Sequence, residues 1–365
     1  MNILYYVTSH GFGHAVRTAA ICNCFNPGVN VTFRTAVPEH FFKEELTVPF
    51  KVLPAEFDCG CIQSDGVTVD IEKTLTTYAQ IAARNDKRVQ DEVALCKELG
   101  ADCIVSDITP FAFQVAHLAG IPSVAVANFT WYDIYSHYTE NYPWFIPELN
   151  RMKQQYGMAN ALLSLEPSIE MEYFGSKQTI PVVGRKGVCR REEICKLYGI
   201  KQEKHLGLIY TGNFGLDTVL WHKLELFSDW EFLGVYPLKG NPANFHLIRK
   251  ADCAYQNLSA SVDVIICKLG YGVLSESFLN GVPLIFLPRS DFAEYPVLEK
   301  EVLAKKQGCK LESEDFFTLK WHDALKKALL LKPNCTEITN FGAQMCAAEI
   351  EKVARKQIQN HSCSQ

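Results

Sequence analysis

The sequence lacks the signatures of several large classes of protein. Its 365 residues contain no Asp-x-Asp pair, so the usual ligands of a metal-bridged diphosphate are missing and we expect no metal site. No apolar run approaches the roughly 20 residues of a membrane-spanning helix, so no integral membrane segment is expected. The first apolar run, residues 3–7, is too short for the core of a signal peptide, which favours a cytoplasmic location. The formal net charge of −5 argues against nucleic acid as a partner.

The cysteines and the length set two further constraints. The 14 cysteines are spread through apolar runs, which is typical of reduced, buried thiols in a cytosolic protein. Cys22/Cys24 and Cys59/Cys61 form two Cys-x-Cys pairs, but neither pair belongs to a four-ligand zinc spacing. A chain of 365 residues, 48% of them hydrophobic, has enough material for two domains with separate cores.

Short apolar runs alternate with helical patterns along the chain, and they fall into two series. Such runs are typical of buried parallel strands. The first series comprises residues 3–7, 31–34, 103–106 and 123–127, and the second comprises residues 206–210, 231–235, 262–267 and 284–287. Helical patterns lie between them, for example at 71–99. The predicted fold class is therefore α/β, with two Rossmann-like domains.

The break between the two series lies near residues 180–187, where proline and glycine interrupt the pattern. We therefore predict an N-terminal domain of residues 1–184 and a C-terminal domain of residues 185–342. The segment 343–365 is predicted to be a terminal helix and tail that could pack back on the N-terminal domain.

A glycine-rich loop with two histidines follows the first predicted strand. Residues 8–14 read Thr-Ser-His-Gly-Phe-Gly-His, and a helix is predicted from Ala15 onward. Glycines let a ligand approach the backbone, and ligands bind at the carboxyl ends of parallel strands. His10 and His14 titrate near neutral pH and could act as acid or base. The alternative is that one or both only cap a helix or line a pocket wall.

Asp107 ends another predicted strand of the first domain. A carboxylate at this position could accept a hydrogen bond from an imidazole and fix its tautomer. The spacing between Asp107 and Pro110 also allows Asp107 to cap a helix that starts near Pro110. A purely structural role for Asp107 is therefore an equal alternative.

The second domain repeats the order of strand, glycine turn and helix at residues 262–280. Gly270 and Gly272 follow the strand, and the next helix can offer its N–H groups and its dipole to a diphosphate. Glu276, about one turn into this helix, is placed to accept hydrogen bonds from ribose hydroxyls. The alternative is that the glycines only make a tight turn and Glu276 is solvated.

Three other segments are candidates for binding sugar or phosphate. Residues 211–215 form a second glycine loop, and Arg289, Asp291 and Glu294 follow the strand 284–287. The aromatic stretch 128–135 follows a strand of the first domain and could line an acceptor pocket, because sugars stack on aromatic faces. The alternative for this stretch is an aromatic cluster under a long loop.

Together these segments resemble the GT-B glycosyltransferases, including the UDP-glycosyltransferases and the N-acetylglucosaminyltransferase that forms lipid II. The chain is also similar, over nearly its whole length, to the glycosyltransferase-like N-terminal region of plant L-arabinokinases and to related bacterial predicted glycosyltransferases. Segments 10–15, 58–65, 128–131 and 270–296 carry this similarity. The resemblance implies two Rossmann-like domains that face each other across a cleft.

The resemblance also implies roles for residues at matching positions. His14 corresponds to the general base, Asp107 to the carboxylate that orients it, and Glu276 to the ribose-binding carboxylate. The expected donor site comprises Gly13, Thr211, Gly212, Asn213, Lys268, Gly270, Tyr271, Gly272, Glu276, Arg289, Asp291 and Glu294. The expected acceptor site comprises His10, Phe12, Asp58, Asp65, Asn128 and Trp131.

The chain also departs from the family pattern. The Asp-Gln or Gln-Gln pair that holds the donor sugar in better-known members is replaced by Asp291 and Ala293-Glu294, which leaves the donor sugar open. No Gly/Ser-rich phosphate loop of a sugar kinase occurs, so we expect no phosphorylation of sugars.

The predicted function is inverting, metal-independent transfer of a sugar from a nucleotide sugar, expected to be a UDP-sugar, to a hydroxyl acceptor of unknown identity. No cofactor is expected besides the nucleotide sugar as co-substrate. Two alternatives stay open. One is an enzyme like the UDP-N-acetylhexosamine 2-epimerases, which would need further carboxylates such as Asp58, Asp65 or Glu294. The other is a non-catalytic module that binds nucleotide sugars.

Overall fold

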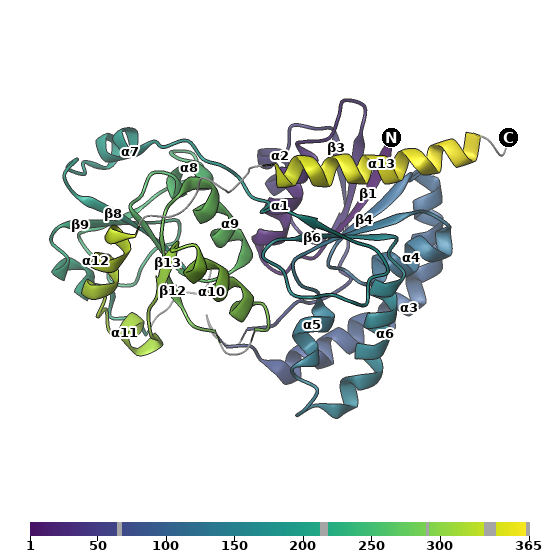
Figure 1. The fold of residues 1–365 in the computed structure, drawn as a ribbon, viewed down its shortest axis with the longest axis horizontal. Helices are drawn as coiled ribbons and strands as arrows, with labels where there is room; N and C mark the ends of the chain where they lie inside the picture. Colours follow the sequence, from purple (N-terminus) through teal and green to yellow (C-terminus); the bar gives the residue numbers. More distant parts are fainter. Residues whose placement is uncertain (64–67, 212–217, 290–291, 332–340, 363–365) are drawn as a thin grey trace. The chain divides into compact units, whose positions relative to one another are not determined.

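The computed structural model describes residues 1–63, 68–211, 218–289, 292–331 and 341–362, which form two compact α/β units (Figure 1). Unit 1 comprises Met1–Ile62, Val69–Gly184 and Asn340–Gln365, and unit 2 comprises Arg185–Thr339 together with Gln63–Thr68. The chain thus passes from unit 1 to unit 2 at residues 184 and 185, and its last helix belongs to unit 1.

Unit 1 is built on a sheet of seven parallel strands in the order β3-β2-β1-β4-β5-β6-β7. The strands are β1 (Asn2–Val7), β2 (Asn30–Thr35), β3 (Phe50–Pro54), β4 (Cys103–Asp107), β5 (Ser123–Ala127), β6 (Ala161–Leu165) and β7 (Lys177–Ile180). The chain leaves β1 toward β2 and β3, and then returns to β4 on the other side of β1. The carboxyl ends of β1 and β4 therefore flank the point where the strand order reverses, which is where open α/β sheets bind ligands.

Helices cover both faces of this sheet (Figure 1). They are α1 (Phe12–Cys22), α2 (Glu39–Glu45), α3 (Ile71–Glu98), α4 (Phe111–Ala119), α5 (Trp131–Ser136), α6 (Ile146–Gly157) and α13 (Gly342–Ser362), with a 3₁₀ turn η1 (Pro143–Phe145). Successive side chains of β1 point to opposite faces. Tyr5 lies near Cys22 of α1 and Cys346 of α13, whereas the Tyr6 hydroxyl contacts Cys96 of α3.

Unit 2 repeats this arrangement with six parallel strands in the order β10-β9-β8-β11-β12-β13. The strands are β8 (His205–Tyr210), β9 (Trp230–Gly234), β10 (Phe245–Leu247), β11 (Val264–Lys268), β12 (Leu284–Leu287) and β13 (Gly308–Lys310). The helices are α7 (Arg191–Tyr198), α8 (Tyr255–Ser259), α9 (Tyr271–Asn280), α10 (Tyr295–Ala304), α11 (Ser313–Phe317) and α12 (His322–Leu330), with η2 (Trp221–Leu226). Here the strand order reverses between β8 and β11.

The fold class predicted from the alternation of strands and helices is confirmed. All eight predicted strands are present, with ends that differ from the prediction by at most two residues. The strands that the sequence analysis missed are β6 and the four edge strands β3, β7, β10 and β13. Edge strands are covered on fewer sides, so they include polar residues, as in the Lys-Gln-Thr-Ile of β7, and their apolar pattern is weak.

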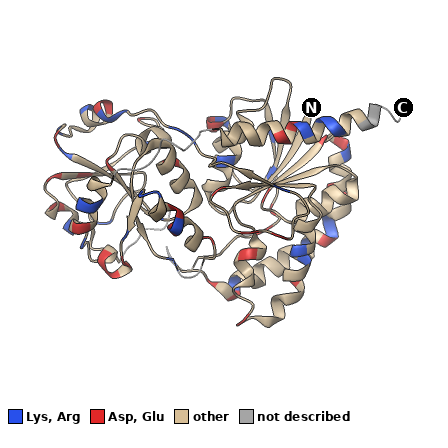
Figure 2. Cartoon of the chain, in the orientation of Figure 1, with Lys and Arg blue, Asp and Glu red and all other residues tan. Residues whose placement is uncertain are grey.

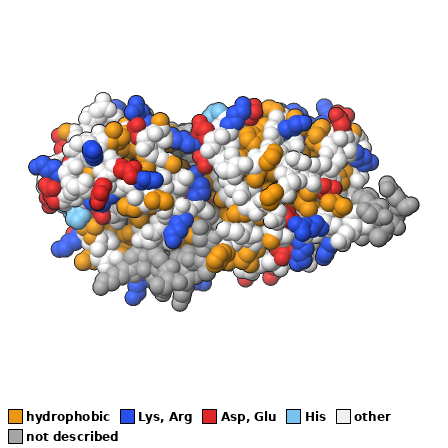
Figure 3. Space-filling view, turned by 90° about the horizontal axis from the view of Figure 1, so that it is seen from above, with side chains coloured by type: hydrophobic (Ala, Val, Ile, Leu, Met, Phe, Trp, Pro, Cys, Tyr) orange, Lys and Arg blue, Asp and Glu red, His pale blue; other side chains and the backbone are white. Residues whose placement is uncertain are grey.

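The surface carries mixed charge. Acidic and basic residues are interspersed along the helices of both units (Figure 2). On the face shown in Figure 3, Lys and Arg side chains alternate with Asp and Glu side chains and with apolar ones, so that face has no extended field of a single sign. Within the described part of the chain, no helix combines the length and the apolar character needed to cross a membrane.

The last helix is tied to unit 1 by close packing and by a buried carboxylate. A Cβ atom at Gly342 would lie 2.4 Å from the Val182 carbonyl oxygen, so the start of α13 requires glycine. Further along α13, Glu351 is 3% exposed and accepts hydrogen bonds from the backbone N–H and the Nδ2 of Asn26, both at 2.8 Å. Arg355 donates to the same carboxylate at 2.7 Å.

We expect Glu351→Ala to lower the free energy of unfolding by about 1.5–3 kcal/mol, because two groups of Asn26 lose a charged acceptor. The measurement is urea denaturation. Glu349→Ala is the matched control, because Glu349 lies on the same helix and pairs only with exposed Lys352 in the described contacts. Its effect should stay within about 0.5 kcal/mol, and equal losses in both variants would contradict this account of the Glu351 contact.

Candidate functional site

The first part of the site lies where β1 and β4 end side by side. Thr8, directly after β1, donates its backbone N–H to the carbonyl oxygen of Asp107, the last residue of β4, at 3.3 Å. Gly11 then turns the chain with a φ of 73°, in the left-handed region that glycine favours, and α1 follows. His14 therefore lies in the first turn of α1. We had expected it to end the loop, but the helix begins three residues earlier than predicted.

His14 and Asp107 form a buried pair. Nδ1 of His14 lies 2.8 Å from Oδ1 of Asp107. Asp107 is fully buried and His14 is 8% exposed. The rings of Phe129 and Trp131 lie beside the imidazole, with centroids 5.8 and 6.2 Å away. The hydrogen bond and the two rings together fix the orientation of the imidazole.

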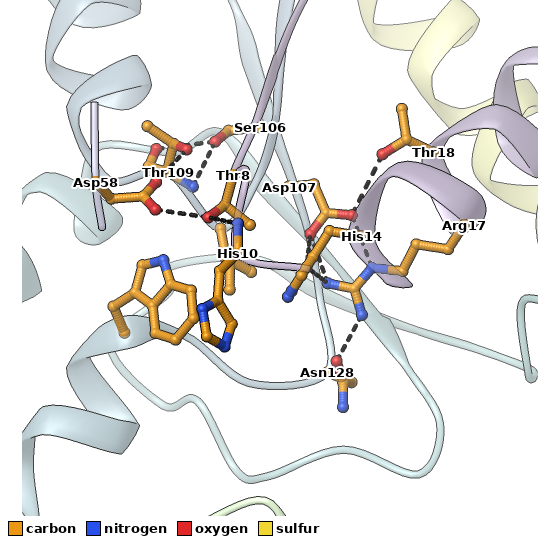
Figure 4. Close-up of polar contacts among 12 residues, drawn as sticks. Thr8, His10, His14, Arg17, Thr18, Asp58, Ser106, Asp107, Thr109 and Asn128 are labelled. Carbon is orange, nitrogen blue, oxygen red and sulfur yellow. Dashed lines mark hydrogen bonds and ion pairs between the residues drawn. The ribbon is translucent and has the colours of Figure 1, made fainter. Parts of the chain in front are cut away.

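Arg17 completes this cluster, and the sequence analysis did not identify it. Its Nε donates to Oδ2 of Asp107 at 2.7 Å and its Nη2 donates to Oδ1 at 2.5 Å, which is a two-pronged contact (Figure 4). Nη1 of Arg17 donates to Oδ1 of Asn128 at 2.6 Å, and the Thr18 hydroxyl lies 3.3 Å from Oδ2 of Asp107. Arg17 follows His14 by three residues, so the two share one face of α1, and this spacing was the available signal.

The charges of the cluster decide its protonation. Burial would raise the pKa of the Asp107 carboxyl, but Arg17 and then His14 stabilise the carboxylate and bring the pKa down to about 2. Burial lowers the pKa of His14 below its usual value; Asp107 opposes this shift and Arg17 adds to it. Near neutral pH the cluster therefore holds an ionised Asp107 and a neutral imidazole. An ionised carboxylate can only accept hydrogen bonds, so Nδ1 carries the imidazole proton and Nε2 keeps its lone pair.

The alternative in which Asp107 caps the next helix is wrong. Pro110 occupies the N-cap position of α4, and no side chain caps that helix. The connection is held by Ser106, whose Oγ accepts from the N–H of Thr109 at 3.0 Å and donates to the Thr109 carbonyl at 2.8 Å. The carboxylate of Asp107 is instead engaged by α1.

A second buried carboxylate lies at the same edge of the sheet. Asp58 is 3% exposed and accepts hydrogen bonds from the hydroxyls of Thr8 at 2.5 Å and Thr109 at 2.7 Å (Figure 4). Burial raises the pKa of the Asp58 carboxyl to about 6, although both threonines favour the charged form. Asp58 is therefore a group that changes charge just below neutral pH.

In unit 2, the predicted glycine turn connects β11 to α9. Lys268 is the last residue of β11, Gly270 is the N-cap of α9, and Tyr271 is buried in the first turn. Glu276 is 3% exposed, so the alternative of a solvated Glu276 is wrong. Nε and Nη2 of Arg185 donate to Oε1 of Glu276 at 3.0 and 2.7 Å. Sequence reasoning missed Arg185, because the two residues are 91 positions apart.

The other expected donor residues of unit 2 lie at neighbouring strand ends. Thr211 follows β8 and is partly exposed. Arg289 follows β12, and its guanidinium lies 4.3 Å from the centroid of the Phe292 ring. Glu294 is 4% exposed at the N-cap position of α10. Gly212, Asn213 and Asp291 lie outside the described residues, as does Asp65 of the expected acceptor site.

Comparison with known proteins adds a family and a curated relative. Residues 1–151 match the family model described as glycosyl transferase family 1. L-arabinokinase from Arabidopsis thaliana is 30% identical over 364 residues, which make up 96% of this chain and 34% of that protein. The chain thus spans about a third of the length of the curated relative it matches.

Solved glycosyltransferases share the architecture over the whole chain. The calicheamicin glycosyltransferase CalG4 superposes with a TM-score of 0.63 at 14% identity, covering 99% of this chain and 97% of that one. Arabidopsis thaliana UGT89C1 complexed with UDP gives a TM-score of 0.60 at 15% identity, covering 98% and 99%. The chain therefore has the GT-B fold of these solved glycosyltransferases, and its first 151 residues match the glycosyl transferase family 1 model.

The residues expected in an acceptor site are brought together only in part. Trp131 and Asn128 are fully buried, so neither offers a surface to an acceptor, and the alternative of an aromatic cluster fits Trp131. His10 packs edge-on against Trp131 with ring centroids 5.3 Å apart, and its Nδ1 accepts from the N–H of Cys61 at 3.3 Å. Phe12 is 43% exposed, and its ring stacks on that of Phe41 with centroids 5.5 Å apart.

Gly13 of the expected donor set lies in the first turn of α1, where a Cβ would meet no atom within 4 Å. The cluster around His14 and Asp107 in unit 1 is therefore buried, and most of its polar side chains are hydrogen-bonded to one another. Glu276 in unit 2 follows the same pattern, because Arg185 occupies one of its oxygens.

We expect Asp58→Asn to gain stability relative to the unchanged chain as the pH rises from 4 to 7. The folded pKa of about 6 exceeds the ordinary value of 3.8, so the contribution of Asp58 is fully present below about pH 4 and is lost as the pH rises through 6. A difference of about two between the folded and unfolded pKa values corresponds to about 3 kcal/mol in the free energy of unfolding. Urea denaturation at several pH values measures this change in stability. Asp91→Asn, on an exposed position of α3, is the control, and parallel pH profiles for both variants would contradict the prediction.

Proposed function

We propose that the chain transfers a sugar from a nucleotide sugar, with UDP as the nucleotide, to a hydroxyl group of an acceptor, with inversion at the anomeric carbon. The observation that carries the proposal is the 2.8 Å contact between Nδ1 of His14 and Oδ1 of Asp107, which leaves Nε2 with its lone pair. The structural neighbour UGT89C1 is complexed with UDP, which supports UDP as the nucleotide.

The step is a single displacement. Nε2 of His14 takes the proton of the acceptor hydroxyl while that oxygen bonds to the anomeric carbon from the face opposite the leaving group. The bond between the anomeric carbon and the diphosphate oxygen breaks, and its electron pair leaves with UDP. A hydroxyl is a poor nucleophile at neutral pH, so this transfer needs a base within hydrogen-bond reach. Asp107 holds the imidazole in the required tautomer and stabilises the imidazolium that forms.

Unit 2 supplies the groups for the nucleotide in this proposal. The N-terminus of α9 offers backbone N–H groups and its dipole to the diphosphate, and Lys268 and Arg289 can add positive charge. Glu276 is the acceptor for the ribose hydroxyls, and its contact with Arg185 orients the carboxylate. These groups can meet the charge of the leaving UDP without a metal, so the proposal includes turnover without divalent cations and with no cofactor.

A cytoplasmic location belongs to the same proposal. All the cysteines among the described residues are free thiols, which fits a reducing compartment.

We expect His14→Ala to reduce turnover by a factor of about 10²–10⁴, because the transfer loses its general base, while UDP binding stays nearly unchanged. Turnover is measured as UDP release from UDP-sugars over a panel of hydroxyl acceptors, and binding is measured by calorimetry with UDP. His117→Ala, on an exposed position of α4, is the control and should keep full activity. Full activity of His14→Ala would contradict the proposal, and conversion of the UDP-sugar without any acceptor would favour the epimerase alternative.

We expect Glu276→Gln to weaken UDP binding by about 1.5–3 kcal/mol, about 10- to 150-fold in Kd, because a neutral amide replaces a charged acceptor for the ribose hydroxyls. Calorimetry with UDP in a buffer with excess EDTA measures it, and the unchanged chain should still bind there. Glu203→Gln, exposed in unit 2, is the control. An unchanged Kd for Glu276→Gln would exclude the ribose assignment, and binding that requires added magnesium would exclude the metal-free donor site.

A further inference from the structure

The charge next to the imidazole distinguishes this cluster from a simple pair of histidine and aspartate. In such a pair the carboxylate is free to stabilise a second proton on the imidazole. Here Arg17 binds both oxygens of Asp107, and its Nη2 lies 3.0 Å from Nδ1 of His14. Because Nδ1 carries the proton that it donates to Asp107, Nη2 and Nδ1 are both donors, and their contact is not a hydrogen bond. It places a positive guanidinium against the imidazole edge.

We infer that Arg17 is a positioning residue that neutralises Asp107 and keeps the imidazole of His14 in its neutral, Nδ1-protonated form. Its role in sugar transfer rests on the proposed function, whereas its effect on His14 does not. The side chain of Arg17 is only 4% exposed, so the guanidinium acts through Asp107 and His14 and does not touch a substrate.

The charge of the buried cluster supports this role. With neutral His14, the charges of Asp107 and Arg17 cancel, whereas a second proton on the imidazole leaves a net charge of +1 in a site with little water. A buried net charge is costly, so the cluster resists protonation. The lowered pKa of His14 is consistent with this, since burial and Arg17 act in the same direction.

The other groups that face the cluster do not compensate the added charge. Tyr5 of β1 and Cys346 of α13 lie near Asp107, and burial raises the pKa of each well above its usual value, so both are neutral near pH 7. Thr18 of α1 and Asn128 after β5 are uncharged, and the remaining neighbours of the imidazole are aromatic rings. Among the described residues, Asp107 and Arg17 are the charges that set the protonation of His14.

Arg17 also fixes the geometry of the base. Its guanidinium connects Asp107 at the end of β4 to Asn128 after β5, so one planar side chain spans two adjacent strands. Lysine would keep the charge but would lose this fork. The effects of charge and geometry can therefore be separated by substitution.

The test is the titration of His14 followed by NMR of the full chain with ¹³C-labelled histidine, in which the His14 signal is the one that disappears in His14→Gln. In the unchanged chain the midpoint should lie below the ordinary value of 6.5. In Arg17→Gln the His14 midpoint should rise by about 1–3 on the pH scale, because Asp107 can then pair with the imidazolium. Arg17→Lys should move it less than Arg17→Gln does.

Arg34→Gln is the matched control. Arg34 is another largely buried arginine of unit 1, paired with Glu92, and it has no described contact with His14. Its removal should cost stability but leave the His14 midpoint unchanged. An active acceptor adds a second readout: the acid limb of kcat/KM should move to higher pH in Arg17→Gln by the same amount as the NMR midpoint.

Two results would overturn the inference. One is a His14 midpoint above 6.5 in the unchanged chain, which requires only the assignment variant His14→Gln to fold and no variant of Arg17. The other is a midpoint that does not rise in Arg17→Gln. Because the titration needs neither donor nor acceptor, a failure of the proposed transfer activity is detected separately. A shifted midpoint in a chain without activity would count against the transfer and not against the role of Arg17.

Discussion

Burial of the Asp107 carboxylate is the constraint on which the rest of unit 1 depends. A carboxylate removed from water is tolerated only when charged and hydrogen-bonding partners surround it. His14, Arg17 and Thr18 supply those partners from consecutive turns of α1, so the helix must begin early enough to place all three over the end of β4. The turn at Gly11 and the position of α1 on the sheet both follow from this requirement.

The topology explains why the two units offer complementary chemistry. In each sheet the strand order reverses beside the first strand of the unit, and polar residues gather at the carboxyl ends there. Unit 1 uses this position for a buried acid-base cluster, whereas unit 2 uses it for a glycine turn and a helix N-terminus. In both, an arginine holds the central carboxylate: Arg17 on Asp107 and Arg185 on Glu276. Each carboxylate is thus oriented by an arginine of its own unit.

The resemblance implied the pairing of His14 with Asp107, whereas the residues alone left a capping role for Asp107 equally open. The sequence itself predicted the interior strands of both sheets except β6, because apolar runs mark buried strands. It did not predict the edge strands, whose polar residues weaken the pattern, or the early start of α1, where two glycines looked like a loop. Arg17 was missed because an arginine on a helix is usually solvated. Trp131 was expected in an acceptor pocket, yet it is buried, since aromatic composition alone does not show which way a ring faces.

The return of α13 to unit 1 has a consequence for the order in which the chain can fold during its synthesis. Most of unit 1 precedes unit 2 in the chain, but Glu351, which binds Asn26 across 325 positions of sequence, is made after unit 2. All of unit 2 leaves the ribosome before that contact can form. Domains generally fold as units, with N-terminal ones first. Unit 2 can therefore complete its fold before unit 1 does. The sheet face that α13 covers stays open until residues 342–362 have been made.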